Sequence, residues 1–425
     1  MKRLRVLVFP CGSEIGLEIY RSLWCMKEVE LFGGSSVDDH GKFVYKNYID
    51  KLPFIDSPDF LQSINQIIAS KSIDYIIAAH DSVLLSLAEA REEGLLNCPV
   101  ITSPYRTVKL CRSKKSTYKL FSGKLRVPHV YPDLEKVDRW PVFLKPDVGQ
   151  GSKGTVLVNN SEVAKFFTAK DSSLLILENL PGEEFTVDCF TDRHGQLRFV
   201  GPRRRVRISN GISVNTKPVA KNRFDSIANR INEELQFRGM WFFQVKESVD
   251  ETLGLMEIAP RLAGTMGLYR NLGVNFPLLS LFDAEGYDIR IIVNDFEIEM
   301  DRALGNKFKV DLFYKHAYID FDDCLLQDGK VNLQIILFIF QCCNKGIKIH
   351  LLTRHAGNIQ ETLKLFRLFN LFDSIITISN GAPKSKFILH KHAVFIDDSF
   401  RERIEVRQSC GIPVFSPDAI ESLLD

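Results

Sequence analysis

The sequence predicts a multidomain protein of the α/β and α+β classes, built from three successive units. Short apolar runs alternate with amphipathic helical patterns in residues 1–105 and again in residues 310–425. Alternation of this kind is typical of parallel sheets covered by helices on both faces. Residues 106–305, between them, contain longer apolar strands joined by glycine- and proline-marked turns. A chain of 425 residues has room for roughly two to four domains.

The composition is that of an ordinary globular protein, with 45% hydrophobic and 25% charged residues. A net charge of +2 gives no electrostatic reason to expect nucleic acid or an acidic membrane as a partner. No apolar run approaches the roughly 20 residues that span a bilayer, and the N-terminal run is too short for a secretory signal. Nine cysteines without a CxxC pair indicate reduced thiols in a cytoplasm, and Cys342 and Cys343 are expected to be buried.

The first unit is predicted to alternate strands with helices. In chain order these are the strand RVLVFP, the helix GLEIYRSLWCM, the strand VELFGG, the helix FLQSINQIIAS, the strand YIIAAH, the helix VLLSLAEAREEG and the strand CPVITS. The turn at residues 11–16 resembles a phosphate-binding loop, but it lacks the complete GxGxxG pattern. A structural turn is therefore the favoured interpretation.

The second unit opens with a basic helix in TVKLCRSKKSTYKLF, followed by an apolar strand, PVFLKP, that carries Lys145. The next loop bears Gly149, Gly151 and Gly154 and leads into another strand, whereas a Walker loop leads into a helix. Glycines let backbone amides approach phosphate oxygens closely, and a lysine adds a point charge over them. Taken alone, a plain hairpin explains this loop equally well.

The segment LLILENLPGEEFTVDCF reads as two strands separated by a proline–glycine break. A strand-to-loop hinge offers an adenine base a hydrogen-bonding backbone edge between apolar side chains. Glu184, just beyond the hinge, can accept hydrogen bonds from ribose hydroxyls. The alternative is that Glu178, Glu183 and Glu184 are solvated loop acids.

A run of arginines follows in GPRRRVRISNG. Because side chains alternate along a strand, Arg203, Arg205 and Arg207 are expected to share one face, with Arg204 on the other. This stripe fits an anionic substrate or a polyphosphate, and it fits a solvated sheet face equally well.

Two short strands joined by a tight turn are predicted in residues 241–264, WFFQVKESVDETLGLMEIAPRLAG. Gln244 lies on the first strand and Glu257 on the second, and two oxygen ligands on neighbouring strands can hold a hard cation such as Mg²⁺. Arg261, just past the second strand, can reach phosphate oxygens with a planar fork of donors. A solvent-facing hairpin with ordinary charges is the alternative.

In this order the segments resemble the ATP-grasp superfamily, nearest to the large subunit of carbamoyl-phosphate synthetase, over roughly residues 1–300. The resemblance rests on Lys114 in the basic helix, FLKP, the GQGSKG loop, the LENLPGEEFTVD hinge, FFQVK and MEIAPRLAG. It implies a Rossmann-like pre-ATP-grasp domain in residues 1–105 and an ATP-grasp fold in residues 106–305.

The resemblance also implies ATP with Mg²⁺, or Mn²⁺ in its place. The residues implied to bind ATP are Lys114, Lys145, Gly149, Gly151, Ser152, Gly154, Glu178, Leu180 and Glu184. Gln244 and Glu257 would hold the metal, and Arg261 would lie near the acyl phosphate or the substrate carboxylate.

One residue departs from the family pattern. Where the family usually reads EINPR, this chain reads EIAPR, so Ala259 replaces the asparagine that completes the metal site. Alanine offers no oxygen, so water or another group must supply that ligand. The implied chemistry is attack of a carboxylate on the γ-phosphate of ATP, followed by capture of the acyl phosphate by an amine. Catalysis then rests on positioning and electrostatics, without a nucleophilic side chain.

The third unit restarts the α/β pattern. Strands are predicted in HAYIDFDDCLL, IKIHLLTRH, SIITIS, AVFIDDSFRER and IPVFS, and helices in VNLQIILFIFQCCNKG, ETLKLFRLFNL and KSKFILHK. Ligands bind at the carboxyl ends of the strands in open α/β sheets. Asp320, Asp322, Asp397 and Asp398 are expected to converge there around a divalent cation, because they would otherwise repel one another.

The motifs DFDDCL, LLTRH and FIDDS, with a lysine between the last two, resemble a haloacid dehalogenase-type phosphatase domain. The implied catalytic and metal-binding residues are Asp320, Asp322, Thr353, Lys384 or Lys386, Asp397 and Asp398. Asp320 would be the nucleophile and Asp322 the general acid and base, while Thr353 and a lysine bind phosphate and the acids hold Mg²⁺. The segment is too short for a large cap domain, so a capless Rossmannoid domain with an open site is expected. Cys324 replaces the customary threonine, and a degenerate structural domain is the alternative.

The leading hypothesis is a fused enzyme, an ADP-forming carboxylate–amine ligase joined to a Mg²⁺-dependent phosphohydrolase. Its substrates would be a small carboxylate, an amine and a phosphorylated small molecule, in a monomer or a homodimer. One alternative keeps only the phosphatase active, with the front units as an ATP-binding regulatory module. Another is a nucleotide-sensing or scaffold protein with neither activity.

Overall fold

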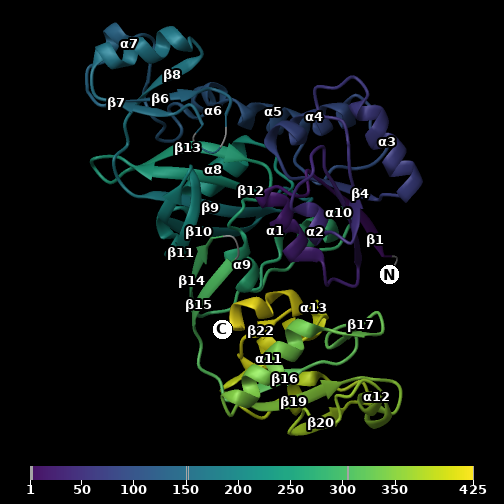
Figure 1. The fold of residues 1–425 in the computed structure, drawn as a ribbon. Helices are drawn as coiled ribbons and strands as arrows, with labels where there is room; N and C mark the ends of the chain where they lie inside the picture. The colour runs from purple at the N-terminus through teal and green to yellow at the C-terminus, as the bar shows by residue number, and fades with distance from the viewer. Residues whose placement is uncertain (1–2, 150, 152, 304–305, 425) are drawn as a thin grey trace.

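The structure, a computed structural model, describes residues 3–149, 151, 153–303 and 306–424 (Figure 1). Its larger sheets follow one another along the chain: a parallel sheet, a small antiparallel sheet, a large antiparallel sheet and a second parallel sheet. None of the helices in this described part is long and apolar enough to cross a bilayer. All nine cysteines are free, as expected, but Cys343 is exposed rather than buried.

The first sheet is parallel, with strand order β3-β2-β1-β4. The predicted strand CPVITS is wrong, because only a single bridge joins Val100 to Ile76, and the fourth strand is the short β3. In the turn before α1, the Ser13 hydroxyl caps the helix by accepting from the amide of Gly16 at 2.9 Å, and the structural interpretation of this turn stays a prediction. The elements are β1 (Leu4–Phe9), α1 (Glu14–Leu23), β2 (Val29–Gly34), α2 (Gly41–Val44), β3 (Asn47–Ile49), α3 (Phe60–Lys71), β4 (Tyr75–Ala78) and α4 (Asp81–Glu92).

The small antiparallel sheet has the order β5-β8-β6-β7 and carries α7 on one face (Figure 1). The basic segment forms two helices rather than one. They separate at Ser113, whose hydroxyl accepts from the amide of Ser116 and caps the second helix. The elements are α5 (Tyr105–Arg112), α6 (Lys114–Phe121), β5 (Val130–Tyr131), η1 (Leu134–Lys136), β6 (Val142–Pro146), β7 (Val156–Val158), α7 (Ser161–Lys170) and β8 (Leu174–Glu178).

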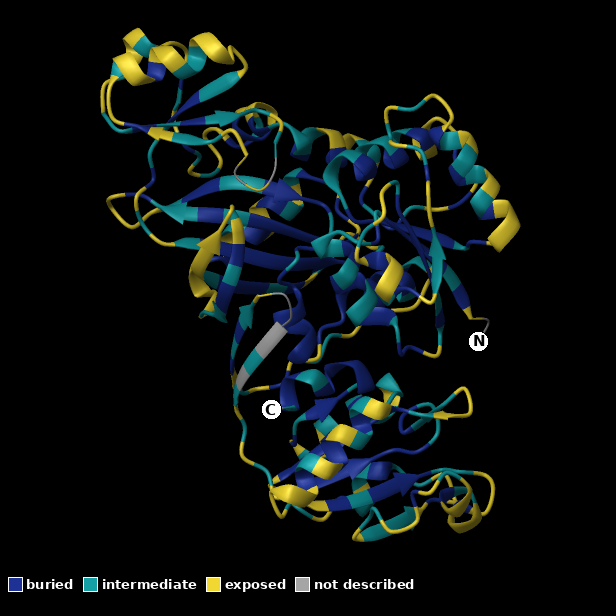
Figure 2. Cartoon of the chain, in the orientation of Figure 1, coloured by how far each residue is buried: buried dark blue, intermediate teal, exposed yellow. Residues whose placement is uncertain are grey.

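The large sheet is antiparallel throughout, in the order β13-β12-β9-β10-β11-β14-β15, and its inner strands are mostly buried (Figure 2). Its last strand, β15, extends past residue 310, so the third unit begins after Asp311. One apolar cluster joins this sheet to the first unit, with Ile19 of α1 and Phe276 of α10 in the same core. The elements are β9 (Glu184–Thr191), β10 (Leu197–Ser209), β11 (Ile212–Pro218), η2 (Lys221–Arg223), α8 (Asp225–Glu234), β12 (Gly239–Glu247), β13 (Leu253–Ala259), α9 (Gly267–Asn271), α10 (Phe276–Ala284), β14 (Glu297–Arg302) and β15 (Asn306–Asp311).

The C-terminal sheet is parallel, as predicted, in the order β20-β19-β16-β21-β22. The helix expected in KSKFILHK is instead the short 3-10 turn η3. The elements are β16 (His316–Ile319), β17 (Leu326–Gln327), β18 (Lys330–Val331), α11 (Leu333–Asn344), β19 (Lys348–Thr353), α12 (Ile359–Leu365), β20 (Ser374–Thr377), η3 (Lys384–Phe387), β21 (Ala393–Ile396), α13 (Phe400–Cys410), β22 (Val414–Phe415) and η4 (Pro417–Leu423).

A buried arginine fastens the C-terminal unit to the others. Arg270 of α9 is 2% exposed and donates from Nε to Glu18 of α1 at 3.0 Å and from Nη1 to the carbonyl of Asp418 at 3.2 Å. Asn294 adds two hydrogen bonds to the backbone of Val414, at 2.7 and 3.2 Å. Because these groups are buried and mutually satisfied, the docking of the units is specific.

Candidate functional site

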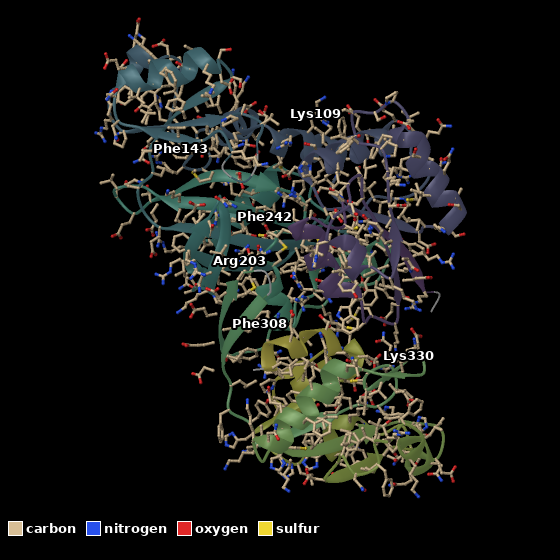
Figure 3. All side chains as sticks on the ribbon, in the orientation of Figure 1. Lys109, Phe143, Arg203, Phe242, Phe308 and Lys330 are labelled. Atoms are coloured by element: carbon tan, nitrogen blue, oxygen red, sulfur yellow. The ribbon has the colours of Figure 1, made fainter. Side chains whose placement is uncertain are left out.

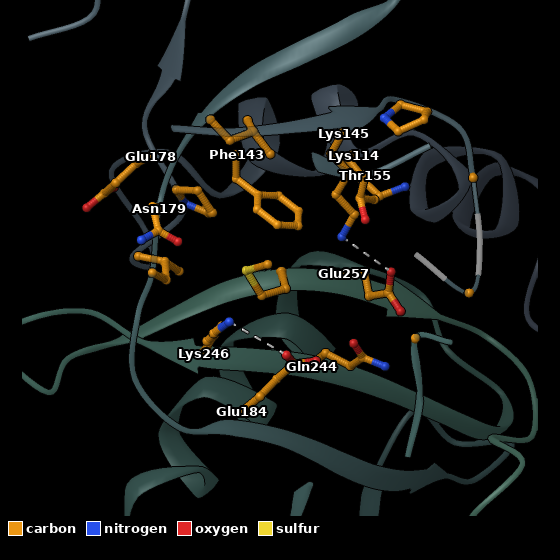
Figure 4. A pocket seen from close by; sticks show the side chains of 18 of the residues that line it. Lys114, Phe143, Lys145, Thr155, Glu178, Asn179, Glu184, Gln244, Lys246 and Glu257 are labelled. Carbon is orange, nitrogen blue, oxygen red and sulfur yellow. Dashed lines mark ion pairs between the residues drawn. The ribbon is translucent and has the colours of Figure 1, made fainter. Parts of the chain in front are cut away.

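A cavity separates the small antiparallel sheet from the large one; we call it the first cavity (Figure 4). Strand β6, the loop that follows it and the end of β8 form one side, and β12 and β13 form the other. Most of the residues that the sequence singles out for the nucleotide and the metal line it: Lys114, Lys145, Gly149, Gly151, Glu178, Leu180, Glu184, Gln244 and Glu257.

Two lysines reach the first cavity from the side of the small sheet. Lys145 lies on β6, and Lys114 is the first residue of α6. Lys114 is 5% exposed, and its Nζ donates to the carbonyl of Asp147 at 3.1 Å. Burial, together with the charge of Lys145, lowers the pKa of Lys114 to about 8. An anion bound between the two ammonium groups would relieve their repulsion.

Gln244 and Glu257 face these lysines from the large sheet. They are direct partners in the register of β12 and β13, as the sequence predicts. Across the cavity, Nζ of Lys145 lies 4.0 Å from the carboxylate of Glu257 (Figure 4). Gln244 and Glu257 thus face a cavity rather than open solvent, and Trp241 and Phe243 on the opposite face of β12 have no exposed surface.

The chain leaves the small sheet at the end of β8 and runs along the first cavity before β9 begins. Leu180 in this connection is 3% exposed and lines the cavity. Glu178 accepts a hydrogen bond from Arg126, and Glu184 accepts one from Arg205. These carboxylates are therefore held by protein donors, and the alternative of solvated loop acids is wrong for both.

The arginines of β10 do not form a free stripe. Arg203, labelled in Figure 3, is 1% exposed and donates to Asp188 at 2.7 and 3.1 Å. The register is irregular after Arg205, and Arg207 lies in the end of the strand, where residues 206–210 are all exposed. Each of the four has a carboxylate partner: Arg203 with Asp188, Arg204 with Glu183, Arg205 with Glu184 and Arg207 with Asp301.

A second cavity continues from the first toward the N-terminal unit and shares Gln244 and Glu257 with it. Arg261 lines this second cavity, and its guanidinium donates to both oxygens of Asp81, at 2.6 and 2.7 Å. Asp81 is the first residue of α4, so the first unit orients this arginine. Arg203 also lines the second cavity, and its buried Nη1 has no hydrogen-bond partner in the described part of the chain.

Solved structures share this arrangement of sheets. The biotin carboxylase domain of Hydrogenobacter thermophilus 2-oxoglutarate carboxylase, in complex with MgADP and bicarbonate, is similar with a TM-score of 0.59 and 14% identity, over 71% of this chain and 75% of that one. N5-carboxyaminoimidazole synthetase from Staphylococcus aureus, complexed with ADP, is similar with a TM-score of 0.57 and 16% identity, over 72% of this chain and 83% of that one. L-amino acid ligase from Bacillus licheniformis is similar with a TM-score of 0.55 and 16% identity, over 71% of this chain and 80% of that one.

A family model described as "ATP-grasp in the biosynthetic pathway with Ter operon" matches residues 170–300. The chain has an ATP-grasp fold. No curated protein matches the chain. The family match ends before the C-terminal parallel sheet, so the haloacid dehalogenase-type resemblance stays a prediction from the motifs.

Two residues of the predicted ATP-grasp phosphate loop are placed differently from the rest. Gly154 does not line the first cavity; its φ of 71° requires a glycine, and an added Cβ would lie 3.1 Å from a ring carbon of Pro146. Ser152 lies outside the described residues. The role of Gly154 in the loop is therefore conformational.

Several residues that line the first cavity were not predicted from the sequence. They are Phe143, Lys153, Thr155, Lys246 and Met256. Phe143 precedes Lys145 by two residues, and Lys246 follows Gln244 by two, so the period of a strand places each pair on one face. Applying that period outward from the two motif residues would have found both. The Nζ of Lys246 lies 3.9 Å from the carboxylate of Glu184 (Figure 4).

A separate polar cluster lies at the carboxyl end of the C-terminal sheet. The carboxylates of Asp320, Asp397 and Asp398, which we call the acid cluster, place oxygens within 4.8 Å of one another. Lys384, 2% exposed, donates to Asp320 and to Asp397 at 2.6 Å each. Burial and the neighbouring charge of Asp397 raise the pKa of Asp320 well above its usual range, and Lys384 opposes this effect.

Thr353, Asp322 and two lysines were also predicted to belong to this site. Thr353 ends β19 and is fully buried. Asp322 stands apart from the three acids; its half-exposed carboxylate is 2.9 Å from Nδ1 of His355. Of the two candidate lysines, Lys384 donates to the acids, whereas Lys386 is exposed.

Three histidines that the sequence did not single out gather near the start of β16. Nδ1 of His316 is 3.0 Å from Nε2 of His350, and the His316 ring stacks on that of His390 with centroids 3.4 Å apart and planes 7° from parallel. The lone pairs of an imidazole lie in its ring plane, so stacked parallel rings do not aim at one point. We therefore assign no metal to these histidines.

Proposed function

We propose that the protein is an ATP-dependent, ADP-forming ligase that joins a carboxylate to an amine through an acyl phosphate. The observation that carries this proposal is the placement of Lys114 and Lys145 opposite Gln244 and Glu257 across one cavity. Structures of the same fold are a biotin carboxylase domain with MgADP, a synthetase with ADP and an L-amino acid ligase, which supports a nucleotide and a ligase reaction here.

The donors that face the lysines fit a hard divalent cation. The amide oxygen of Gln244 and the carboxylate of Glu257 are neighbours on paired strands, and Mg²⁺ or Mn²⁺ takes oxygen ligands and retains water and phosphate partners. Such a cation supplies neutralisation of the triphosphate charge. Ala259 belongs to an apolar core cluster and contributes no oxygen, so the protein offers two ligands where the usual motif offers three.

The remaining chemistry is binding and orientation by the chain itself. Lys114 and Lys145 bind phosphate oxygens from the small-sheet side, and the connection at Leu180 provides an apolar wall and backbone groups for the base. The second cavity adjoins the metal-binding pair at Glu257 and receives the carboxylate substrate. The guanidinium groups of Arg261 and Arg203 line it, each paired with a carboxylate, and Nη1 of Arg203 is a donor that no described protein group uses.

The test is ADP release from MgATP in the presence of pooled small carboxylates and pooled amines, each supplied alone and then together. The proposal expects ADP formation that requires both pools. ADP release at the same rate with and without the carboxylate and amine pools would indicate a simple ATPase. ATP binding without turnover in every pool would favour the regulatory or nucleotide-sensing alternatives.

The low pKa of Lys114 gives a pH dependence. Its ammonium is charged below about pH 8 and neutral above it, so ATP affinity of the free protein is expected to fall as pH rises through about 8. Calorimetric titration with a non-hydrolysable ATP analogue on either side of that pH measures the effect. In Lys114→Arg the fall should move beyond the tested range, because a guanidinium stays protonated. Identical profiles for the two proteins would contradict the assignment.

A second activity is favoured by the acid cluster with its buried lysine. We propose that the C-terminal unit is a haloacid dehalogenase-type phosphohydrolase. Three carboxylates within 4.8 Å fit Mg²⁺, which supplies charge neutralisation at the phosphoryl group. Asp320 attacks phosphorus as the ester P–O bond breaks, and Asp322 gives its proton to the leaving ester oxygen. Asp322 then takes a proton from the water that cleaves the aspartyl phosphate, which releases phosphate and regenerates the Asp320 carboxylate. Lys384 and Thr353 bind the phosphoryl oxygens.

Replacing the nucleophile provides the test of this second activity. The wild-type protein is expected to hydrolyse a generic aryl phosphate with Mg²⁺, and Asp320→Asn should reduce the rate to that of the buffer, because an amide does not attack phosphorus. Asp373→Asn is the matched control, since Asp373 pairs with Lys348 on the surface of the same unit. Hydrolysis that persists in Asp320→Asn would remove the nucleophile assignment.

A further inference from the structure

The loop after α1 of the first unit reaches the acid cluster of the C-terminal unit. Nζ of Lys27, in this loop, lies 2.8 Å from Oδ2 of Asp398 and 3.5 Å from Oδ2 of Asp323. Gln327 of the C-terminal unit donates to the backbone carbonyl of Cys25 at 2.7 Å, which fixes the same loop. Two segments almost 300 residues apart in sequence thus meet at one cluster of charges.

The charges at this meeting point are nearly balanced. Lys384 forms ion pairs with Asp320 and Asp397, and Lys27 forms one with Asp398. Every carboxylate of the acid cluster therefore has an ammonium partner. The Lys384 side chain is 3% exposed and belongs to the C-terminal unit itself, whereas the Lys27 side chain is 43% exposed. Lys27 can therefore move into solvent at small cost, while Lys384 cannot.

We propose that Lys27 is an additional residue of the C-terminal site, where it competes with the divalent cation for Asp398, so that the first unit sets the metal affinity. This inference rests on the proposed phosphohydrolase site. A hard cation needs carboxylate oxygens, and the ammonium of Lys27 already holds one of them. A positive charge next to a cation site weakens binding whichever oxygen of Asp398 the cation takes. By linkage, cation binding must weaken the contact between Lys27 and Asp398 by the same factor.

The test is calorimetric titration of the full chain with Mg²⁺ alone, without nucleotide or phosphate ester. Lys27→Met, which keeps the length of the side chain and removes its charge, is expected to bind Mg²⁺ about fivefold more tightly than the wild type at low salt. Added NaCl should narrow this difference, because the lysine is partly exposed. Lys27→Arg should retain the wild-type affinity. Lys42→Met, which removes an exposed lysine paired with Asp38, is the control and should change nothing.

Asp398→Asn separates the two ways in which this idea can fail. If Asp398→Asn binds Mg²⁺ as well as the wild type, the acid cluster does not hold the metal, and both the phosphohydrolase and the role of Lys27 are refuted. If Asp398→Asn loses binding and Lys27→Met binds no more tightly than the wild type, only the role of Lys27 is refuted. Thermal unfolding of each variant shows that the comparison is made on folded protein.

Discussion

Glu257→Gln is expected to lower ATP turnover by about 100-fold or more, the order of loss caused by removing one preorganised electrostatic group. Glutamine has nearly the same shape as glutamate, so the pairing of β12 with β13 should be kept. What is lost is the negative charge that faces Lys145 at 4.0 Å and that the metal requires. The substitution therefore separates the charge of Glu257 from its packing.

Two measurements check this expectation. The first is ADP release with the substrate pools that support wild-type turnover, and the second is the gain in ATP affinity on adding Mg²⁺, which needs no substrate. Glu247→Gln is the matched control, because Glu247 ends the same strand, pairs with Arg223 and lies outside both cavities. Wild-type Mg²⁺ enhancement in Glu257→Gln would show that the metal is held elsewhere.

Arg270→Leu is expected to destabilise the protein by about 3–5 kcal/mol, the usual cost of leaving buried charges without their partner. Glu18 and Asp418 are 1% and 2% exposed, so neither carboxylate can turn to water after the substitution. Leucine fills part of the volume that the arginine side chain occupies. The loss of stability should therefore come mainly from the lost charge rather than from an empty cavity. Because the two acids come from different units, the loss should weaken docking of the C-terminal unit before it weakens either core.

Denaturant unfolding followed by tryptophan fluorescence and by circular dichroism measures this effect. Divergence of the two transitions in Arg270→Leu would show separate unfolding of the units. Arg230→Leu is the control, since Arg230 is half exposed and pairs with Glu233 on one helix, where a loss below about 0.5 kcal/mol is expected. Coincident transitions at the wild-type midpoint would refute the docking role of Arg270.

Local sequence signals were sufficient for the strand pair that holds Gln244 and Glu257. An apolar pattern of period two, a short polar turn and a second apolar run determine which residues oppose one another. The same signals placed Asp320 and Asp397 at the ends of neighbouring strands. Where alternation and chain order are enough to locate a residue, the sequence predicts its position correctly.

Contacts between strands that are not joined by a tight turn could not be predicted from these local signals. Arg203 meets Asp188 because β10 lies beside β9 in the large sheet, and the register irregularity beside Arg207 has no residue signature. Strand β3 is three residues long and has no apolar run, so it gave no periodic signal.

The break between α5 and α6 could have been predicted from the sequence, because Ser113 is a helix-capping residue type inside a basic segment.

Helix α1 bears on any attempt to study the proposed activities in isolation. Its first residue, Glu14, lines the second cavity, and the loop after its last turn, about 15 Å away, touches Asp398. Expressing residues 1–311 by themselves would remove the buried hydrogen-bond partners that Asp418 provides for Arg270 and Val414 provides for Asn294. The C-terminal unit therefore contributes buried contacts to the part of the chain that has the ATP-grasp fold, and removing it should destabilise that part.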